Sequence, residues 1–170
     1  MGVYFKQFYK GLIPHRMFLL IAIIWGLIMI FIIGPLQIPD ETNHFFRAYQ
    51  VSQFKFMPEV KNNILGGELP SSFWILISNF SNIPYHAEEK LSFALIDSSL
   101  RVKVNPDETT FMLFSNTALY SPIPYIPQAT GISIGKLFSL PPLILLYLGR
   151  LFNLALWIIM VYTAIKNYPH

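Results

Sequence analysis

The sequence predicts an α-helical integral membrane protein with about three transmembrane helices and a mixed α/β loop on the extracytoplasmic side. Apolar residues make up 54% of the 170 residues and charged residues only 12%, whereas a soluble domain carries about 25% charged residues. Two apolar runs are long enough to cross a bilayer. All nine acidic residues lie between these two runs. Composition, run length and charge distribution therefore agree on a membrane protein.

The first apolar run, 17–36, follows a basic N-terminal segment, 1–16. At about 1.5 Å per residue the run extends about 30 Å, the thickness of the hydrocarbon core of a bilayer. No small-x-small cleavage site follows it, so we expect a retained signal anchor. Residues 1–16 contain three Lys or Arg and no acidic residue, and the positive-inside rule places them in the cytoplasm. The predicted location is the cell membrane, with several spans and a cytoplasmic N-terminus.

Residues 37–120 form the predicted extracytoplasmic loop, which opens with a juxtamembrane helix at 40–54. Asp40, His44 and Arg47 are spaced i, i+4 and i+7, so they share one face of that helix. The aromatic residues of the helix point elsewhere: Phe45, Phe46 and Tyr49. This pattern predicts a helix that lies in the membrane interface and is held there by aromatic anchors.

Residues 100–114 are predicted to form a β-hairpin. The segment alternates in polarity, turns at Asn105-Pro106-Asp107 and continues in β-prone residues, which is the pattern of two strands joined by a turn. The tetrapeptide Pro-Asp-Glu-Thr occurs here, at 106–109, and also at 39–42. We interpret the second copy as a turn, so it serves as an internal comparison for the first.

Two further membrane segments are expected after the loop. Residues 121–140 have prolines clustered at the start, where a missing amide hydrogen costs little, and small residues such as Gly131 and Gly135 that permit close helix packing. A short second span and a re-entrant helix are both open interpretations of this segment. Residues 143–165 form the third predicted span, which is interrupted by Arg150.

Composition also excludes several kinds of site. The chain has no cysteine, which excludes disulfides, thiolate catalysis and Cys-ligated zinc. The net charge is only +3 and no long run of Lys and Arg occurs, so nucleic acid is not an expected partner. The histidines form no zinc-hydrolase motif. The remaining candidates are carboxylate, histidine and arginine side chains near the lipid boundary.

The acid pair Asp40 and Glu41 is the first candidate site. A carboxylate pair at the membrane boundary suits an enzyme that acts on a lipid-carried substrate, as a base or as a metal ligand. Asp40 or Glu41, together with His44, would supply ligands for a divalent cation such as Mg²⁺ or Mn²⁺. The alternative is structural, because acids in the first turn of a helix after a proline are ordinary capping and dipole chemistry worth about 0.3–1 kcal/mol.

Arg150 is the second candidate, because an arginine within a span costs roughly 2.5–3.5 kcal/mol even on the mildest scales. Two interpretations stay open. Either its long side chain packs or extends toward the aqueous face, or it binds a substrate phosphate. Asn153 is a nearby partner for hydrogen bonds between helices.

Three groups of residues together resemble a known family. They are Ile38-Pro39-Asp40-Glu41 with His44-Phe45-Phe46-Arg47-Ala48, Tyr120-Ser121-Pro122 with Tyr125-Ile126-Pro127-Gln128, and Gly149-Arg150-Leu151-Phe152-Asn153. In that order and spacing they resemble the N-terminal portion of a bacterial multispan membrane family catalogued as domain-of-unknown-function family 2142. That family is similar in outline to C-type (GT-C) glycosyltransferases, which move a sugar from a polyprenyl phosphate at the outer membrane face.

The resemblance implies roles for particular residues. In GT-C enzymes an acidic residue just past the first span acts as base or holds the metal, which implies Asp40 or Glu41 as the catalytic residue. The stretch Tyr120-x-Pro122-x-x-Tyr125 resembles a segment of lipid-A aminoarabinose transferases in which a lysine beside the prolines meets the phosphate of the donor. Here no lysine flanks Pro122, so the phosphate contact is unassigned. The implied substrate-binding residues are Arg47, Tyr120, Tyr125, Gln128 and Arg150.

The leading hypothesis is therefore the N-terminal part of a polyprenyl-phosphate-sugar-dependent, glycosyltransferase-like membrane protein that acts on cell-envelope polysaccharide. Members of such families carry many more spans, so we expect a fragment of a larger GT-C-like fold that is inactive by itself. Its expected partners are the lipid bilayer, a polyprenyl-phosphate-linked sugar, and the remaining spans or a partner membrane subunit. Two alternatives stay open: a non-catalytic subunit or truncated remnant that packs against a partner, and a component of a lipid-linked sugar transporter.

Overall fold

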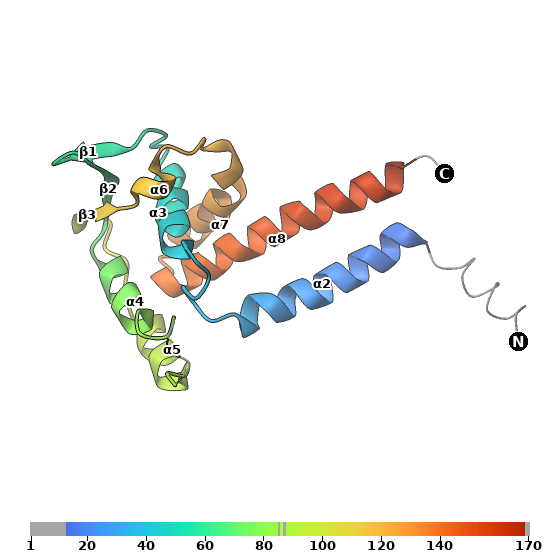
Figure 1. Ribbon diagram of the computed structural model, residues 1–170, viewed down its shortest axis with the longest axis horizontal. Helices are drawn as coiled ribbons and strands as arrows, with labels where there is room; N and C mark the ends of the chain where they lie inside the picture. The colour runs from blue at the N-terminus through green and yellow to red at the C-terminus, as the bar shows by residue number, and fades with distance from the viewer. Residues whose placement is uncertain (1–12, 85, 87, 169–170) are drawn as a thin grey trace, which may run out of the picture.

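A computed structural model describes residues 13–84, 86 and 88–168. Two long helices, α2 (Pro14–Ile32) and α8 (Pro142–Asn167), run side by side in opposite directions (Figure 1). All other elements gather at one end of this pair, in a region that we call the head, residues 33–141. Both ends of the described chain lie at the opposite end of the pair. Most of the predicted cytoplasmic segment 1–16 lies outside the described residues.

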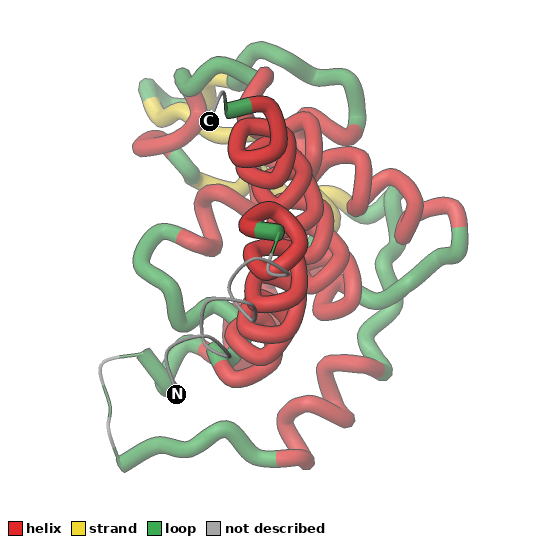
Figure 2. The backbone as a smooth tube through the Cα atoms, turned by 90° about the vertical axis from the view of Figure 1, so that its right-hand side faces the viewer, coloured by secondary structure: helices red, strands yellow, loops and turns green. Residues whose placement is uncertain are grey.

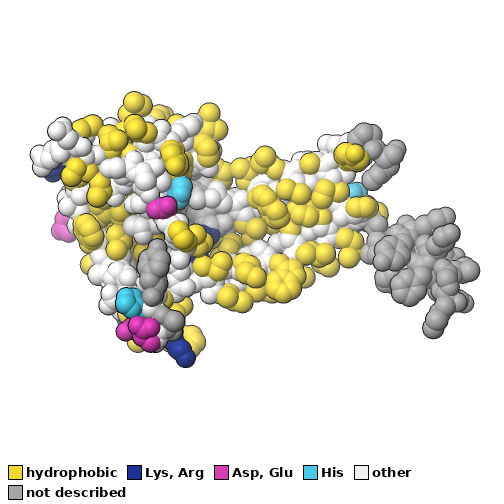
Figure 3. Space-filling view, in the orientation of Figure 1, with side chains coloured by type: hydrophobic (Ala, Val, Ile, Leu, Met, Phe, Trp, Pro, Cys, Tyr) yellow, Lys and Arg dark blue, Asp and Glu magenta, His cyan; other side chains and the backbone are white. Residues whose placement is uncertain are grey.

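Helix α2 is apolar on all sides. It contains 19 residues, which is about 29 Å of helix, and Pro14 occupies its first turn, where a missing N–H costs nothing. Ala22 is its one buried residue, and its large side chains are exposed in the isolated chain, as the yellow surface of the two-helix arm shows (Figure 3). Surfaces of this kind and size face lipid or protein rather than water. The helix ends at Ile32, four residues before the end of the apolar run.

Helix α8 is longer than α2. Its 26 residues extend about 39 Å, and aromatic contacts fix how it lies along α2, with Tyr162 against His15 at one end and Tyr147 against Phe31 at the other. The turns of α8 before Tyr147 therefore extend past α2 into the head. In the part of the chain that the structure describes, α2 and α8 are the two helices long and apolar enough to cross a membrane.

The structure disfavours one of the two open interpretations of 121–140, the short second span, and leaves the re-entrant helix as a prediction. This segment forms a 3-10 turn, η1 (Ile123–Tyr125), and a helix of 12 residues, α7 (Ile126–Leu137). About 18 Å of helix does not cross a hydrocarbon core of about 30 Å. Prolines before the helix and the Pro141-Pro142 turn after it set this length. Two candidate spans among the described residues thus replace the expected three, and α7 packs along the first half of α8.

The interior of the head is aromatic. Helix α3 (Glu41–Ser52) lies within the predicted range 40–54, and its last eight residues are buried. Phe45 and Phe46 pack on Phe73, with ring centroids 5.1 and 6.2 Å apart, and the Tyr49 ring meets Phe73 edge-on at 4.8 Å. The prediction that these aromatic residues anchor a helix in the membrane interface is therefore wrong, because they form the core of the head instead.

The head also contains a three-stranded antiparallel sheet in the order β1 (Glu59–Lys61), β2 (Ile64–Pro70), β3 (Thr109–Leu113). Its strands are yellow behind the two long helices in Figure 2. Asn62 and Asn63 join β1 to β2 with positive φ angles of 54° and 61°, as tight hairpin turns require. Strand β3 pairs with β2 from Gly66↔Leu113 to Pro70↔Thr109.

The hairpin predicted at 100–114 is therefore wrong in its pairing. Residues 101–105 form no strand, and the second Pro-Asp-Glu-Thr copy lies in a turn that leads into β3. The partner of β3 is β2. Gly66 permits the close approach of the two strands, because a Cβ there would lie within 3.1 Å of the Met112 backbone. Three short helices complete the head: α4 (Ser72–Phe80), α5 (Phe93–Leu100) and α6 (Ser115–Ala118).

Substituting Gly131 on α7 tests the contact between α7 and α8. A Cβ at Gly131 would lie 2.6 Å from the Leu148 carbonyl oxygen in the backbone of α8. We expect Gly131→Leu to destabilise the chain by about 1–3 kcal/mol, as overpacking does, and thus to lower the unfolding temperature in detergent. Thr130→Leu is the matched control, because Thr130 is the exposed neighbour on the same helix. Equal unfolding temperatures for the two variants would contradict this packing.

Candidate functional site

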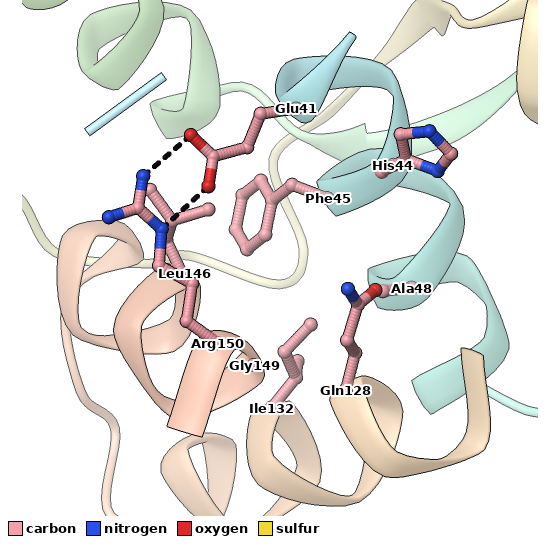
Figure 4. Close-up of a pocket in the computed structure, with 9 residues that line it drawn as sticks. All are labelled: Glu41, His44, Phe45, Ala48, Gln128, Ile132, Leu146, Gly149 and Arg150. Carbon is pink, nitrogen blue, oxygen red and sulfur yellow. Dashed lines mark hydrogen bonds and ion pairs between the residues drawn. The ribbon is translucent and has the colours of Figure 1, made fainter. Parts of the chain in front are cut away.

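Glu41, the first residue of α3, forms a bidentate ion pair with Arg150 of α8. Arg150 Nε donates to Oε1 at 2.6 Å and Nη2 donates to Oε2 at 2.7 Å (Figure 4). Nη1 donates to the carbonyls of Ile30 and Ile33, and Nη2 to that of Gly34, at 2.8–3.0 Å. A guanidinium has five N–H donors, so all five have an acceptor.

This ion pair holds three elements together. The last carbonyls of a helix have no intrahelical donors, and Arg150 supplies donors at the end of α2 while Glu41 ties the start of α3 to the same guanidinium. Both side chains are close to 10% exposed, and the Tyr147 ring lies 5.2 Å from the guanidinium carbon. Of the two open interpretations of Arg150, packing is the one that the structure shows in the isolated chain. Glu41 has no free carboxylate oxygen in this arrangement.

His44 lies one turn beyond Glu41 on α3 and pairs with Tyr125 of η1. Its Nδ1 lies 2.8 Å from the Tyr125 hydroxyl, and the two rings stack with centroids 5.8 Å apart. Burial raises the pKa of the Tyr125 hydroxyl, and the nearby Arg47 charge partly opposes that rise. The phenol therefore stays protonated near neutral pH and can donate to Nδ1. The pairing fixes the orientation of the imidazole ring.

Two adjoining cavities share Glu41, His44, Gln128 and Arg150 as lining residues. The smaller, about 30 Å³, lies between α3, α7 and α8 and is drawn in Figure 4. The larger is an open groove of about 390 Å³ that continues between α2 and α8. We call it the interhelical groove. Its remaining lining residues are Gly26, Met29, Ile30, Ile33, Ile38, Pro39, Asn153 and Leu154.

Gln128 supplies an unused acceptor to these cavities. Its side chain comes from α7 and points toward Arg150 and His44 in Figure 4. The Oε1 atom is buried and accepts no hydrogen bond from any residue that the structure describes. A buried acceptor without a donor is costly, so Gln128 is a candidate for a polar contact at the cavity wall.

Asp40 faces a different cavity from its neighbour Glu41. Asp40 is exposed and adopts a left-handed conformation, φ 61°, as the N-cap residue of α3. Its Oδ1 accepts a hydrogen bond from Asn116 Nδ2 at 2.9 Å. It lines a cavity of about 270 Å³ together with Gln37, Thr42, Asn43 and Ser81, among others. Aspartate adopts a positive φ more readily than most residues other than glycine, so this conformation serves the turn that leads into α3.

Arg47 does not share the cavities of Glu41 and His44. Its side chain is 1% exposed, and it donates to Gln50 Oε1 and to the carbonyls of Phe56 and Tyr120. Burial lowers the pKa of the Arg47 guanidinium from its ordinary value, and the adjacent Tyr125 opposes this change. The structure thus gives Arg47 a role in joining α3 to two loops. The predicted contact of Arg47 with substrate has no cavity to support it here.

Comparison with known families identifies the family to which the chain belongs. The family model described as "Predicted membrane protein (DUF2142)" matches residues 23–170, which include most of α2, the head and α8. The chain belongs to this family. No curated protein and no solved structure matches it. Family membership and the two long apolar helices together make it a membrane protein that contacts the lipid bilayer.

Metal binding by this DUF2142 member stays a prediction. In the described ranges, no group of three or more His, Cys, Asp or Glu is placed to hold a metal ion. Of the expected ligands, Asp40 and His44 line different cavities, whereas Glu41 shares its cavities with His44 and is paired with Arg150. The sequence-based site is therefore divided, with Glu41, His44, Tyr125, Gln128 and Arg150 brought together, Asp40 beside them across the start of α3, and Arg47 turned into the core.

Two features of the site were not found by sequence reasoning. Asn116, which holds Asp40, is 76 residues away, and nothing in its local sequence marks it. Gly26 forms part of the wall of the interhelical groove, and a Cβ there would meet the Leu154 side chain at 2.6 Å. A glycine at mid-span is a local signal for close helix approach, so Gly26 had a usable signal and Asn116 had none.

Replacing Arg150 tests the ion pair. Arg150→Met leaves the Glu41 carboxylate buried and unpaired, and we expect a loss of about 3–5 kcal/mol in the free energy of unfolding. Adding Glu41→Gln should restore part of this loss, with a coupling energy of about 0.5–3 kcal/mol. Denaturant titration in detergent micelles measures both.

The matched control is Arg101→Met, which breaks another bidentate pair, with Asp97, that is exposed to solvent. We expect little change there, because exposed pairs contribute little. Additive effects of the Glu41 and Arg150 substitutions would show that the observed pair does not stabilise the fold.

Proposed function

We propose that this chain is the donor-side part of a membrane glycosyltransferase that takes a sugar from a polyprenyl-phosphate carrier and adds it to a cell-envelope polysaccharide. The observation that carries the proposal is the interhelical groove, which is apolar between the two spans and polar where it meets the head. A lipid-linked sugar has the same division, with an apolar chain joined to a polar head group. The change in polarity along the groove thus matches that of the proposed lipid-linked sugar.

The apolar part of the groove suits a prenyl chain. Its walls come from both long helices and include Gly26, Met29 and Leu154. Gly26 lets α2 and α8 approach closely along this wall, because a side chain there would meet Leu154. The polar part suits a sugar, since Gln128 and Asn153 line it and Gln128 has an unused acceptor. Ligand sites commonly combine apolar walls with a few placed polar groups in this way.

The phosphate of the donor is proposed to meet Arg150. In the isolated chain Glu41 occupies this guanidinium as an internal anion. A phosphate can make the same bidentate contact, so donor binding would exchange one anion for another and release the Glu41 carboxylate into the groove. His44, oriented by Tyr125, lines the same groove and can hydrogen-bond the sugar.

Asp40 is the proposed base. It carries a carboxylate that is held through one oxygen by Asn116. Its cavity combines polar residues such as Thr42 and Asn43 with apolar ones such as Phe80, and a mixed lining of this kind suits an acceptor sugar. In the proposed step the acceptor hydroxyl attacks the anomeric carbon, its proton passes to Asp40, and the bond to the carrier phosphate breaks. Ile38 and Pro39 line both this cavity and the interhelical groove, so the two lie side by side just before the start of α3.

A non-catalytic membrane subunit is the second candidate function. The observation in its favour is that every N–H of Arg150 is used within the chain, as expected for a structural residue. In that case Glu41 and Arg150 serve to fasten the head to the spans. The exposed apolar surface of α2 would then face lipid or a partner helix.

Asp40→Asn and Asp107→Asn separate these functions. Both residues are exposed and both stand second in a Pro-Asp-Glu-Thr tetrapeptide, so the substitutions are chemically identical. In the native host we expect Asp40→Asn to reduce incorporation of the transferred sugar by about 10²–10⁴-fold, the usual effect of removing a general base, while Asp107→Asn retains it. Composition analysis of the envelope polysaccharide measures this, with membrane levels of each variant checked by immunoblot. Wild-type sugar content in both variants at normal levels would reject the catalytic role and favour the structural subunit.

A further inference from the structure

The segment that joins α6 to α7 exposes an uncharged apolar strip on the surface of the head. Its members are Leu119 and Ile123, each 70% exposed, Tyr120 at 55% and Ile126 at 54%. We call these four residues the interfacial strip. No Asp, Glu, Lys or Arg occurs between residues 109 and 135, so the surroundings of the strip on the chain are uncharged as well.

Helix packing gives the height of this strip relative to the spans. Helix α7 runs antiparallel to α8, because Gly131 lies against Leu148 and Phe152 while Gly135 lies against Leu145. The start of α7 is therefore level with residues 150–152 of α8. Arg150 in turn bonds the carbonyls at the end of α2. The interfacial strip, which ends at the first residue of α7, is thus level with the last turn of α2.

The last turn of α2 is still apolar and exposed, with Phe31 at 64% and Ile32 at 70%. A span that remains apolar to its end contacts lipid to that height. The strip therefore lies at the same height as lipid-facing residues at the end of α2. In Figure 1 the gold segment between α6 and α7 lies on the side of the head nearest the two long helices.

We propose that the interfacial strip inserts into the membrane leaflet on the side of the head, so that the head rests on the bilayer. The insertion is shallow, because backbone without regular hydrogen bonds is not tolerated deep in hydrocarbon. Pro122 and Pro124 reduce that difficulty, since they have no N–H to satisfy. Tyr120 is a residue type that favours the height of the lipid head groups. This inference does not depend on the proposed transferase function.

The opposite end of α7 provides a matched control position. Leu137 is 81% exposed and apolar, like the strip, but it lies about 16 Å farther along the helix by helical rise. Because α7 points away from the spans, Leu137 is held clear of the membrane. Ile123 and Leu137 are therefore both apolar and exposed, but they lie at different heights relative to the membrane.

Fluorescence quenching tests the insertion. The chain has no cysteine, so Ile123→Cys and Leu137→Cys each give one site for an environment-sensitive dye on the full chain in lipid nanodiscs. We expect lipids spin-labelled near the head group to quench the dye at position 123 several-fold more than the dye at 137. We expect aqueous iodide to quench mainly the dye at 137.

Three results would overturn the proposal. These are equal iodide quenching at the two positions, lipid quenching at 137 as strong as at 123, or protection of 123 from both quenchers, which would mean that protein covers the strip. Ile126→Cys is a second probe on the same strip in case the first variant fails to fold.

Discussion

One guanidinium in a span determines how the head sits on the membrane. Arg150 would be costly in lipid if it were unpaired, and the chain meets that cost by gathering five acceptors from the end of α2 and the start of α3. This contact fixes the start of α3 against α2 and α8. The same contact places a neutralised pair of charges at the polar end of the interhelical groove, where an unpaired charge would disfavour an apolar ligand.

The two acidic residues at the exit of α2 have different roles because they face different surroundings. Glu41 enters the first turn of α3 and is held by Arg150, whereas Asp40 turns the other way through its positive φ and keeps one carboxylate oxygen outside the Asn116 contact. Both capping and reactive chemistry had been open for this pair. The structure divides those interpretations between the two residues, with Glu41 structural in the isolated chain and Asp40 the more available carboxylate.

Local signals in the sequence were sufficient to locate the long helices and insufficient to predict which distant residues pair. An apolar run long enough to cross a membrane is a property of consecutive residues, so α2 and α8 could be located from the sequence, as could a helix at 41–52. The partner of β3 is a strand some 40 residues earlier, and the counterion of Arg150 is 109 residues away. No local pattern contains such pairings. The aromatic residues of α3 were wrongly predicted to lie in the membrane interface, because that interface and a protein core are enriched in the same side chains.

The placement of the site has a consequence that holds for an enzyme and for a subunit alike. Removing a prenyl chain from lipid costs about 0.8 kcal/mol per CH₂ group, so a carrier lipid cannot be lifted to a site above the membrane. A protein that handles it must bring polar groups down to the bilayer surface. Here Tyr125 lies in η1, between Ile123 and Ile126 of the interfacial strip, and holds His44. Insertion of the strip would therefore fix the polar end of the groove at the level of the lipid head groups. The apolar walls of the groove would then let the chain of the lipid stay in the membrane while its head group reached Gln128 and Arg150.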